Sequence, residues 1–444
     1  MKKEPDSVVP VLVCPRDEVI VAERMARREA LIDAQLINGV QAIFSQVEQR
    51  GDRAVLDATR THDGVVLRDS RVPESEFEQA IDALSTELRA AIEVGRDRIE
   101  RVNRALLPRD VIREMEPGAR VGELYRPLDS VALWIPCRKG PLLSTALMLV
   151  TAARVAGVPR IVVLMPPRAD GSADPGTLAA ARLAGAQDCY VGNGVALLAA
   201  ATHGTESLPR VAGVFGPGPG AIAVAMAMAG MFGLKTVVGI GPTDCAVLAD
   251  DSADPQLVAW DLASEAEHGP DSASLLATSS EVFAHAVAAQ LADIISSADE
   301  NRRENLRRVF GEAGRGMLVV KPDFTAACAL AARFAPEHLS IVCRAERQAE
   351  AIASAVAGEV LLGAHTPFSA ANYAIGITAV LPTNGAARAI SGITARDMQR
   401  TTTLGELDAA ALAALTPTIV TLARYEGLPC HAAAAEARRG RQTS

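Results

Sequence analysis

The chain has 444 residues, of which 49% are hydrophobic and 22% are charged, and its formal net charge is −9. This length predicts two to three domains, because a single hydrophobic core seldom grows beyond about 250–300 residues. The acidic balance argues against nucleic acid or an anionic membrane surface as a partner.

The cysteines and the first residues favour a cytoplasmic protein. The seven cysteines are scattered, odd in number and free of any Cys-x-x-Cys pair, which indicates reduced thiols rather than disulfides or a cysteine-rich zinc site. The chain turns acidic before any apolar run, so we expect no signal peptide. The longest apolar run, 221–234, is too short to span a bilayer and predicts a buried helix.

The first part of the chain has helical periodicity. Residues 17–105 place Arg and Glu on one face and aliphatic residues on the other. From Ser130 the pattern changes to short apolar strands that alternate with helices. The expected strands are 131–135, 161–165, 211–215 and 236–240, and the expected helices are 143–155, 177–183 and one that starts at 221.

A second alternating block follows, and after Thr383 the chain becomes Ala-rich and is expected to be helical. Continuously apolar strands that alternate with helices are typical of parallel sheets covered on both faces, so we predict an α/β fold. The expected strands of this block are 245–249, 274–278, 317–320, 340–342 and 359–362, and its expected helices are 255–267, 281–314 and 347–357.

Three polar segments stand out from this apolar chain. Glu265 and His268 are three residues apart, so on a helix they project from one face and can bind one ion; the alternative is an incidental pair on an exposed face. Glu337 and His338 are adjacent and suit acid–base chemistry, unless His338 is merely a satisfied turn histidine. Near the C-terminus, Glu426 and His431 supply another carboxylate and another imidazole.

A series of short motifs follows one another along the chain. They are His62-Asp63-Gly64-Val65, Phe215-Gly216-Pro217-Gly218, Gly241-Pro242-Thr243, the run 267–272, Pro336-Glu337-His338-Leu339 and Val380-Leu381-Pro382-Thr383. With these motifs in this order, the chain resembles the histidinol dehydrogenase family over nearly its whole length. The family implies two incomplete Rossmann-like parallel-sheet domains with helical N- and C-terminal extensions, assembled as a homodimer. It also implies oxidation of a small amino alcohol to the amino acid in two NAD-dependent steps at a zinc site.

The resemblance implies domain boundaries as well. The first Rossmann-like domain, with the metal and the acid–base site, would combine 26–129 with 242–385. The second, which is the cofactor-binding region of the family, would be 130–241. A helical segment 1–25 would precede them, and a helical arm 386–444 would reach the partner of the dimer.

Roles for individual residues follow from the same resemblance. His338 would be the general base for the alcohol, and Glu337 would activate the water that adds to the aldehyde. Thr243 and Glu426 would contact the substrate, and Trp134 would contact the cofactor. The metal ligands would be Glu265, His268, Asn372 and His431, the last from the other subunit.

The chain departs from the family within the predicted site. Glu265 replaces a Gln ligand and Asn372 replaces an Asp ligand, so the summed ligand charge is unchanged and zinc remains suitable. Asn372 has an alternative role as a helix cap. Phe368 replaces a Glu, and Thr378-Ala379 replaces Asn-His, which predicts a less polar substrate than histidinol.

The predicted cofactor region departs further. A Pro-Gly-Gly loop reads Pro136-Cys137-Arg138-Lys139-Gly140, and its side chains would crowd a pyrophosphate. A cofactor-contacting Gln falls at Val195 or Ala196, and an Asn is replaced by Pro219. Cys137 beside two cations also raises the separate hypothesis of a reactive thiolate.

Three functions therefore stay open. The first is a metal-dependent oxidoreductase that acts on an alcohol other than histidinol with NAD or NADP. The second is an enzyme that keeps the metal and the bases but runs non-redox chemistry without NAD. The third is a non-catalytic binding protein, which the retention of Glu337, His338, His268 and His431 disfavours.

Overall fold

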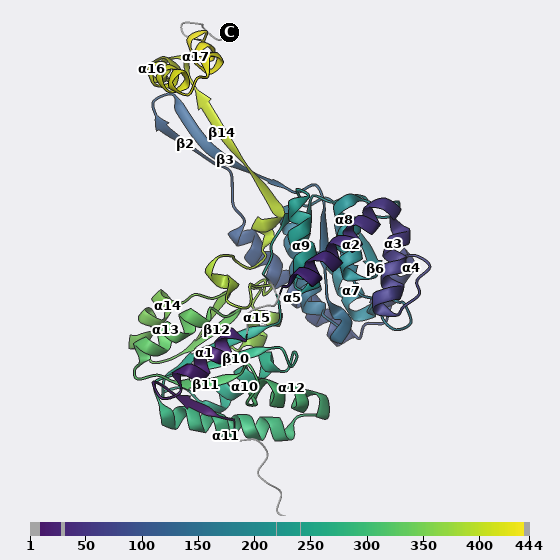
Figure 1. Ribbon diagram of the computed structural model, residues 1–444, viewed down its shortest axis with the longest axis vertical. Helices are drawn as coiled ribbons and strands as arrows, with labels where there is room; N and C mark the ends of the chain where they lie inside the picture. The colour runs from purple at the N-terminus through teal and green to yellow at the C-terminus, as the bar shows by residue number, and fades with distance from the viewer. Residues whose placement is uncertain (1–8, 28–31, 219, 240, 439–444) are drawn as a thin grey trace, which may run out of the picture. The chain divides into compact units, whose positions relative to one another are not determined.

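The chain folds into two compact units, each built around its own sheet or sheets (Figure 1). The computed structural model describes residues 9–27, 32–218, 220–239 and 241–438. The first unit joins Met1–Ala105 to Asp129–Met398 and holds two parallel sheets, and the second joins Leu106–Leu128 to Gln399–Ser444 and holds an antiparallel sheet. Among the helices of these described ranges, none has the length and apolar character to cross a membrane.

A six-stranded sheet has the order β1-β11-β10-β9-β12-β13, and all its pairings are parallel. Its inner strands are apolar along both faces, as expected for a sheet that helices cover on both sides. Its strands are β1 (Val11–Val13), β9 (Asp244–Ala249), β10 (Ala273–Thr278), β11 (Met317–Val320), β12 (His338–Val342) and β13 (Glu359–Leu362).

Six main helices cover the two faces of this sheet. One face packs against α10 (Pro255–Ala266), α11 (Glu281–Ser297) and α12 (Glu300–Phe310). The other packs against α1 (Glu18–Ala26), α13 (Phe324–Phe334) and α14 (Ala345–Ser354). Several of these helices begin at a side chain that accepts a hydrogen bond from the first turn, an N-cap that contributes about 1 kcal/mol each. The caps are Asp254, Ser280, Asp299 and Asp323.

A five-stranded parallel sheet has the order β6-β5-β4-β7-β8. Its strands are β4 (Val131–Trp134), β5 (Ile161–Met165), β6 (Asp188–Val191), β7 (Gly213–Phe215) and β8 (Lys235–Thr236). One face packs against α2 (Ala34–Arg50), α3 (Asp52–Ala58), α8 (Gly194–His203) and α9 (Ala221–Met231). Helix α6 (Leu143–Ala156) contacts the central strands from the other side, beside α7 (Pro175–Ala184), α4 (Glu74–Asp82) and α5 (Thr86–Leu106).

The second unit is an antiparallel ribbon joined to two helices. The strands β2 (Val111–Glu116), β3 (Ala119–Pro127) and β14 (Gln399–Leu407) pair in the order β14-β3-β2. Helices α16 (Ala409–Tyr425) and α17 (Pro429–Glu436) share a small apolar cluster of Val420, Ala423 and Ala432. The sequence did not predict these three strands, because their exposed, charged residues lack the apolar pattern of the parallel strands. The expectation that 386–444 is helical was therefore wrong for Gln399–Leu407, which forms β14.

The predicted α/β fold with two parallel sheets is confirmed, but its divisions differ. Residues 106–128 belong with the C-terminal unit, although they were expected within 26–129 of the first domain. Helices α2, α3 and α4 pack on the five-stranded sheet, whereas the prediction grouped them with 242–385. The expected N-terminal helical segment 1–25 also contains β1, which pairs with β11. Strand β6 and helix α8 were not predicted, and β8 ends before the expected 236–240 does.

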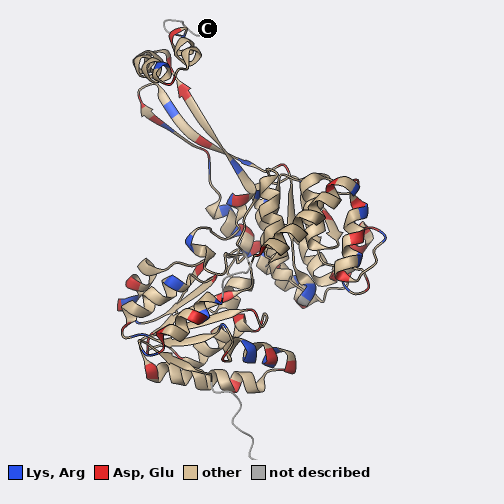
Figure 2. Cartoon of the chain, viewed as in Figure 1, with Lys and Arg blue, Asp and Glu red and all other residues tan. Residues whose placement is uncertain are grey.

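Charged residues are rare in the strands of the parallel sheets and are found mainly on helices (Figure 2). In the described strands of the six-stranded sheet, the charged or imidazole residues are Asp244, His338 and Glu359. Each is the first residue of its strand, and all three are buried. Because parallel strands start at one edge, this edge gathers the polar chemistry of the sheet.

Candidate active site

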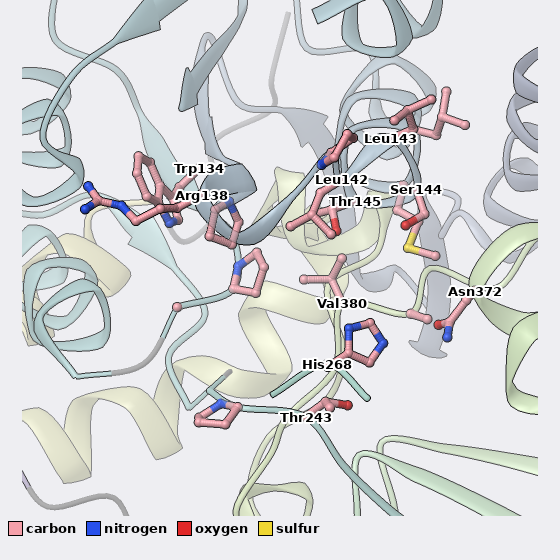
Figure 3. Close-up of a pocket in the computed structure, with 18 of the residues that line it drawn as sticks. Trp134, Arg138, Leu142, Leu143, Ser144, Thr145, Thr243, His268, Asn372 and Val380 are labelled. Carbon is pink, nitrogen blue, oxygen red and sulfur yellow. The ribbon is translucent and has the colours of Figure 1, made fainter. Parts of the chain in front are cut away.

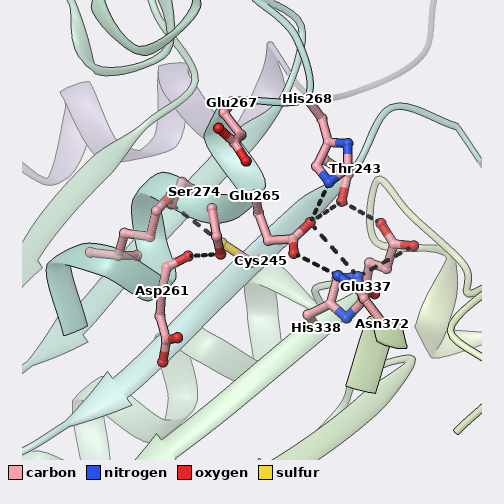
Figure 4. A network of polar contacts seen from close by, with 12 residues as sticks. Thr243, Cys245, Asp261, Glu265, Glu267, His268, Ser274, Glu337, His338 and Asn372 are labelled. Carbon is pink, nitrogen blue, oxygen red and sulfur yellow. Dashed lines mark hydrogen bonds and ion pairs between the residues drawn. The ribbon is translucent and has the colours of Figure 1, made fainter. Parts of the chain in front are cut away.

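The amino ends of three neighbouring strands bring carboxylates and an imidazole together. Strands β9, β12 and β13 are adjacent, and the backbone register places His338 opposite Cys245 on one side and Glu359 on the other. Thr243 immediately precedes β9, and Glu337 immediately precedes β12. Their side chains therefore meet in one polar cluster (Figure 4).

Helix α10 delivers Glu265 to this cluster. Glu265 lies in the last turn of α10 and is buried, and His268 lies in the turn that follows the helix, with its side chain half exposed. The Nε2 atom of His268 is 3.7 Å from Oε2 of Glu265. The two residues predicted to bind one ion thus do meet, although the helix ends at Ala266 and His268 is outside it.

The Thr243 hydroxyl bridges two carboxyl groups. Its Oγ1 is 2.9 Å from Oε2 of Glu265 and 2.8 Å from Oε2 of Glu337. A hydroxyl has one proton and can donate to only one of them, so the other contact requires a proton on a carboxyl group. Burial raises the pKa of Glu337 to about 8 against the opposing effect of His338. At neutral pH Glu337 therefore holds that proton while Thr243 donates to Glu265.

His338 is surrounded by three carboxyl groups. Its Nε2 is 3.6 Å from Oε1 of Glu337 and 3.9 Å from Oε2 of Glu265, and its Nδ1 is 2.5 Å from Oε1 of Glu359. Burial alone would lower the pKa of His338, but Glu337, Glu265 and Glu359 outweigh it and raise the pKa to about 10. In the metal-free cluster the imidazole is therefore protonated at neutral pH.

Two residues of this cluster, Asp244 and Glu359, were missed from the sequence. Asp244 accepts a hydrogen bond from the backbone N–H of Glu337 at 2.6 Å and another from the backbone N–H of Asn384 at 2.6 Å, which fixes the peptide before His338. A usable signal existed, because a carboxylate at the start of a continuously apolar strand is seldom buried without a partner.

Asn372 completes the set of candidate metal ligands that this unit contains. It lies on α15 (Phe368–Tyr373), and its Nδ2 donates to Oε1 of Glu265 at 3.2 Å. Turning the amide over would present its oxygen to an ion at Glu265 instead. Within the described ranges, no three His, Cys, Asp or Glu side chains are arranged to hold a metal ion. The Glu265 carboxylate and the His268 imidazole are ligand types that zinc prefers, whereas the amide oxygen of Asn372 would be a weak ligand, so a further ligand is required.

The cluster opens on a cavity of about 1190 Å³ within the first unit (Figure 3). This volume exceeds the roughly 300–1,000 Å³ of a typical small-molecule site, so it suffices for a substrate and a cofactor together. Thr243, Glu265, His268, Glu337, His338 and Asn372 line its polar end. The wall formed by α5 and α6 is apolar and includes Leu88, Ile92, Val94, Leu143, Leu147 and Met148.

The cavity also extends along the carboxyl ends of the five-stranded sheet. Trp134, predicted to contact the cofactor, ends β4 and lines the cavity; it is 4% exposed, and its Nε1 has no hydrogen-bond partner among the described residues. Asn193 caps α8 by accepting a hydrogen bond from the Ala196 N–H at 3.2 Å, and its Nδ2 donates to Asp63 at 3.0 Å. Arg138 also pairs with Asp63. A network of side chains thus surrounds the start of α8.

The other predicted departures in this region have mixed outcomes. Val195 lines the cavity, whereas Ala196 is fully buried within α8. Pro219 and the side chain of Lys139 lie outside the described residues. Arg138 reaches the cavity as expected.

The hypothesis of a reactive Cys137 was wrong. The residue is buried in a short 3-10 turn and is not among those that line the cavity. Burial raises the pKa of its thiol to about 12, and Asp174 adds to this effect. The thiol therefore stays protonated and cannot serve as the proposed nucleophile. Because Cys137 does not line the cavity, it also does not crowd the cofactor site as expected.

Glu426 and His431 belong to the second unit. Glu426 is the residue at which α16 ends, and His431 lies in the first turn of α17. Both are exposed. Their predicted contacts with substrate and metal stay predictions.

Comparisons with known proteins point to one family over nearly the whole chain. A family model described as histidinol dehydrogenase matches residues 26–439. The histidinol dehydrogenase of Xanthomonas axonopodis pv. citri is 36% identical over 425 residues, which cover 96% of this chain and 97% of the relative. That of Synechocystis sp. is 38% identical over 416 residues, covering 93% and 94%. The crystal structure of histidinol dehydrogenase from Elizabethkingia anophelis superposes with a TM-score of 0.87 at 29% identity, covering 94% and 95%.

Proposed function

The chain belongs to the histidinol dehydrogenase family of enzymes, and we propose that it oxidises an alcohol at a metal-dependent site with a nicotinamide cofactor. The observation that carries this proposal is the buried cluster of Glu265, Glu337 and His338, which opens on a cavity large enough for two ligands. Acid–base groups beside such a cavity are what alcohol oxidation requires.

In the proposed reaction, His338 and Glu337 move the protons. The Nε2 of His338 would accept the proton of the substrate hydroxyl, and a nicotinamide cofactor bound in the cavity beside Trp134 would supply the hydride acceptor. In a second oxidation, Glu337 in its carboxylate form would remove a proton from the water that adds to the aldehyde; a divalent ion at Glu265 would favour that form, because it would offset the repulsion between the two carboxylates. Neutral imidazole is needed for the first step, and a divalent ion held at Glu265 would offset that carboxylate and lower the pKa of His338 toward neutrality.

The metal would be held by Glu265, His268 and Asn372 of one chain. A fourth ligand is needed for zinc, and His431 of a second copy is our candidate, which makes the enzyme a homodimer. Glu426 would contact substrate from the same arm, and Thr243 would do so from the cavity wall. The absence of disulfides among the seven cysteines supports a reducing cytoplasm as the place of action.

We propose that the substrate is less polar than histidinol. Phe368 is fully buried beside His338, and Ala379 and Val380 line the cavity near the cluster. Thr378 is tied to Asn103, whose Nδ2 donates to its hydroxyl at 2.9 Å, so it serves packing rather than substrate binding. An alcohol with an aliphatic or aromatic group would match the apolar wall of α5 and α6.

The use of a nicotinamide cofactor has one serious alternative, which is an enzyme that works without NAD. The indole of Trp134 lines the cavity at the end of β4 and offers an apolar surface to a cofactor ring, which supports nicotinamide use. The pairing of Arg138 and Asn193 with Asp63 favours the alternative, because it places side chains where backbone would approach a pyrophosphate. In that alternative the same metal and bases carry out NAD-independent, non-redox chemistry.

The test is formation of reduced nicotinamide by zinc-loaded protein. L-histidinol, L-leucinol and L-phenylalaninol would each be supplied with NAD or NADP, and the absorbance of the reduced cofactor followed. We expect turnover with an apolar amino alcohol and less with L-histidinol, with His338→Asn as the inactive control. Preference for L-histidinol would refute the substrate proposal, and no reduced cofactor with any alcohol would favour the non-redox alternative.

A further inference from the structure

We propose that Glu359 is a positioning residue that holds the imidazole of His338 in one orientation and one tautomer. This inference rests on the proposed function only in assigning the proton transfer to His338. The contact between the two side chains follows from the sheet itself, because the parallel register of β12 and β13 places their first residues opposite each other.

The contact is short, buried and directed at one ring nitrogen. Oε1 of Glu359 lies 2.5 Å from Nδ1 of His338, and the two side chains are 5% and 3% exposed. A carboxylate only accepts hydrogen bonds, so the imidazole must donate Nδ1–H. Nε2 is then the nitrogen left to face Glu337 and the cavity.

Glu359 acts through His338 and not on the substrate. His338 is among the residues that line the cavity, whereas Glu359 is not. On its other flank the His338 ring meets Phe368, with ring centroids 5.6 Å apart and planes at 51°. Phe368 supports the ring by packing but its side chain offers no hydrogen bond, so the polar anchor of Nδ1 is Glu359.

Burial of the Glu359 carboxylate costs folding free energy, and the positioning of His338 explains why a carboxylate is found there. It is the charged residue of the four-residue strand β13, whose other members are Val360, Leu361 and Leu362. Its second oxygen, Oε2, has no hydrogen-bond partner among the described residues. Buried polar atoms without partners are rare in folded proteins and concentrate where function requires the group. An apolar residue would suit a purely structural strand better.

The experiment compares Glu359→Gln and Glu359→Ala in the full-length, zinc-loaded protein, with Glu346→Ala as the matched control. Glu346 is an exposed carboxylate in the first turn of α14, in the same block of the fold. Gln keeps the shape and an acceptor oxygen for Nδ1–H, whereas Ala removes both. Steady-state kinetics would use the best alcohol found, and NMR with isotope-labelled histidine would report which nitrogen of His338 carries the proton.

We expect Glu359→Ala to lower kcat by roughly 10–100-fold, the range for loss of an orienting partner, with KM changed by less than about twofold. Glu359→Gln should recover most of the loss, and Glu346→Ala should match wild type. The His338 signals should show Nδ1–H in wild type and in Glu359→Gln, and a mixture of tautomers in Glu359→Ala.

An unchanged kcat in Glu359→Ala, or an unchanged tautomer of His338, would overturn the inference. A rise in KM with constant kcat would also overturn it, because that result indicates substrate binding by Glu359. If wild type oxidises no alcohol, the proposed function fails, but the NMR comparison still decides the role of Glu359. If Glu359→Ala does not fold, the Nδ1 proton signal of Glu359→Gln decides instead, and an unshifted signal contradicts a hydrogen bond to the carboxylate.

Discussion

The six-stranded and the five-stranded sheets present different kinds of polar edge to the same cavity. At the first, Glu265, Glu337 and His338 are buried, and the imidazole lies within 4 Å of both carboxyl groups. At the second, Arg138 is largely exposed and pairs with Asp63 beside the start of α8. Charges interact strongly where water is excluded and weakly where it is not. Substitutions should therefore have large effects at the first edge and modest effects at the second.

The largest effect is expected for His338→Asn. Removing the general base should lower kcat by roughly 10²–10⁴-fold, because the other imidazole at the polar end of the cavity, His268, is the proposed metal ligand and cannot replace it. Asn is close in size and polar, so the fold should be retained, as circular dichroism would show. The control His365→Asn replaces an exposed histidine of the same block. Retained turnover in His338→Asn would remove this residue from the mechanism.

The second effect concerns the metal. His268→Ala should weaken zinc binding by more than the roughly 10–100-fold typical of an outer-shell partner, because a direct ligand is lost. Competition with a chromogenic chelator measures this affinity. His285→Ala is the matched control, since His285 is an exposed histidine near a glutamate on α11, as His268 is near Glu265 on α10. Equal zinc affinities for the two variants would contradict the proposed site.

A smaller effect is expected at the five-stranded sheet. Arg138→Gly removes the partner of Asp63 and restores flexible backbone to the loop after β4. If the side chain crowds the cofactor, NAD affinity should rise by up to about tenfold, or 1.4 kcal/mol. Calorimetric titration of wild type and variant with NAD measures the change. Weaker binding in the variant would show that the guanidinium contacts the cofactor, which would reverse our interpretation of this edge.

The smallest effect is a pH dependence of stability in the metal-free protein. Folding raises the pKa of His338 from 6.5 to about 10, so its stabilising contribution is complete below pH 6.5 and is lost as pH rises toward 10. Glu337, with a pKa raised to about 8, acts in the same direction. Thermal melts should thus show a falling midpoint over this range, with a weaker fall in His338→Asn. A melting midpoint that rises with pH would contradict the raised pKa values of His338 and Glu337 in the folded protein.

Most of the polar residues at the edge of the six-stranded sheet could be predicted from the sequence, because they occur in short motifs. Glu265 and His268 are close in the chain, and Glu337 and His338 are neighbours, so short motifs place each pair. Glu359 could not be found in this way. The contact between Glu359 and His338, which are 21 residues apart, depends on the register of β12 and β13. No local sequence pattern specifies that register.

The parallel sheets were predictable and the antiparallel ribbon was not, for a similar reason. Buried parallel strands such as Ile161–Met165 are continuously apolar and stand out. Strands β2 and β3 are exposed and charged, and the one available signal was the Pro117-Gly118 turn between them. The packing of α2 to α4 on the five-stranded sheet is decided by tertiary contacts. The prediction, which relied on order along the chain, therefore grouped these helices with the wrong sheet.

We propose that this enzyme transfers hydride to a nicotinamide cofactor, and calorimetric titration of the zinc-loaded protein with NAD, then NADP, tests this most directly. We expect micromolar binding of at least one, at a single site per chain and weakened by substitution of Trp134, which lines the cavity at the end of β4. No binding up to millimolar concentrations of either would contradict hydride transfer and leave the metal and the Glu337–His338 pair as a non-redox catalyst.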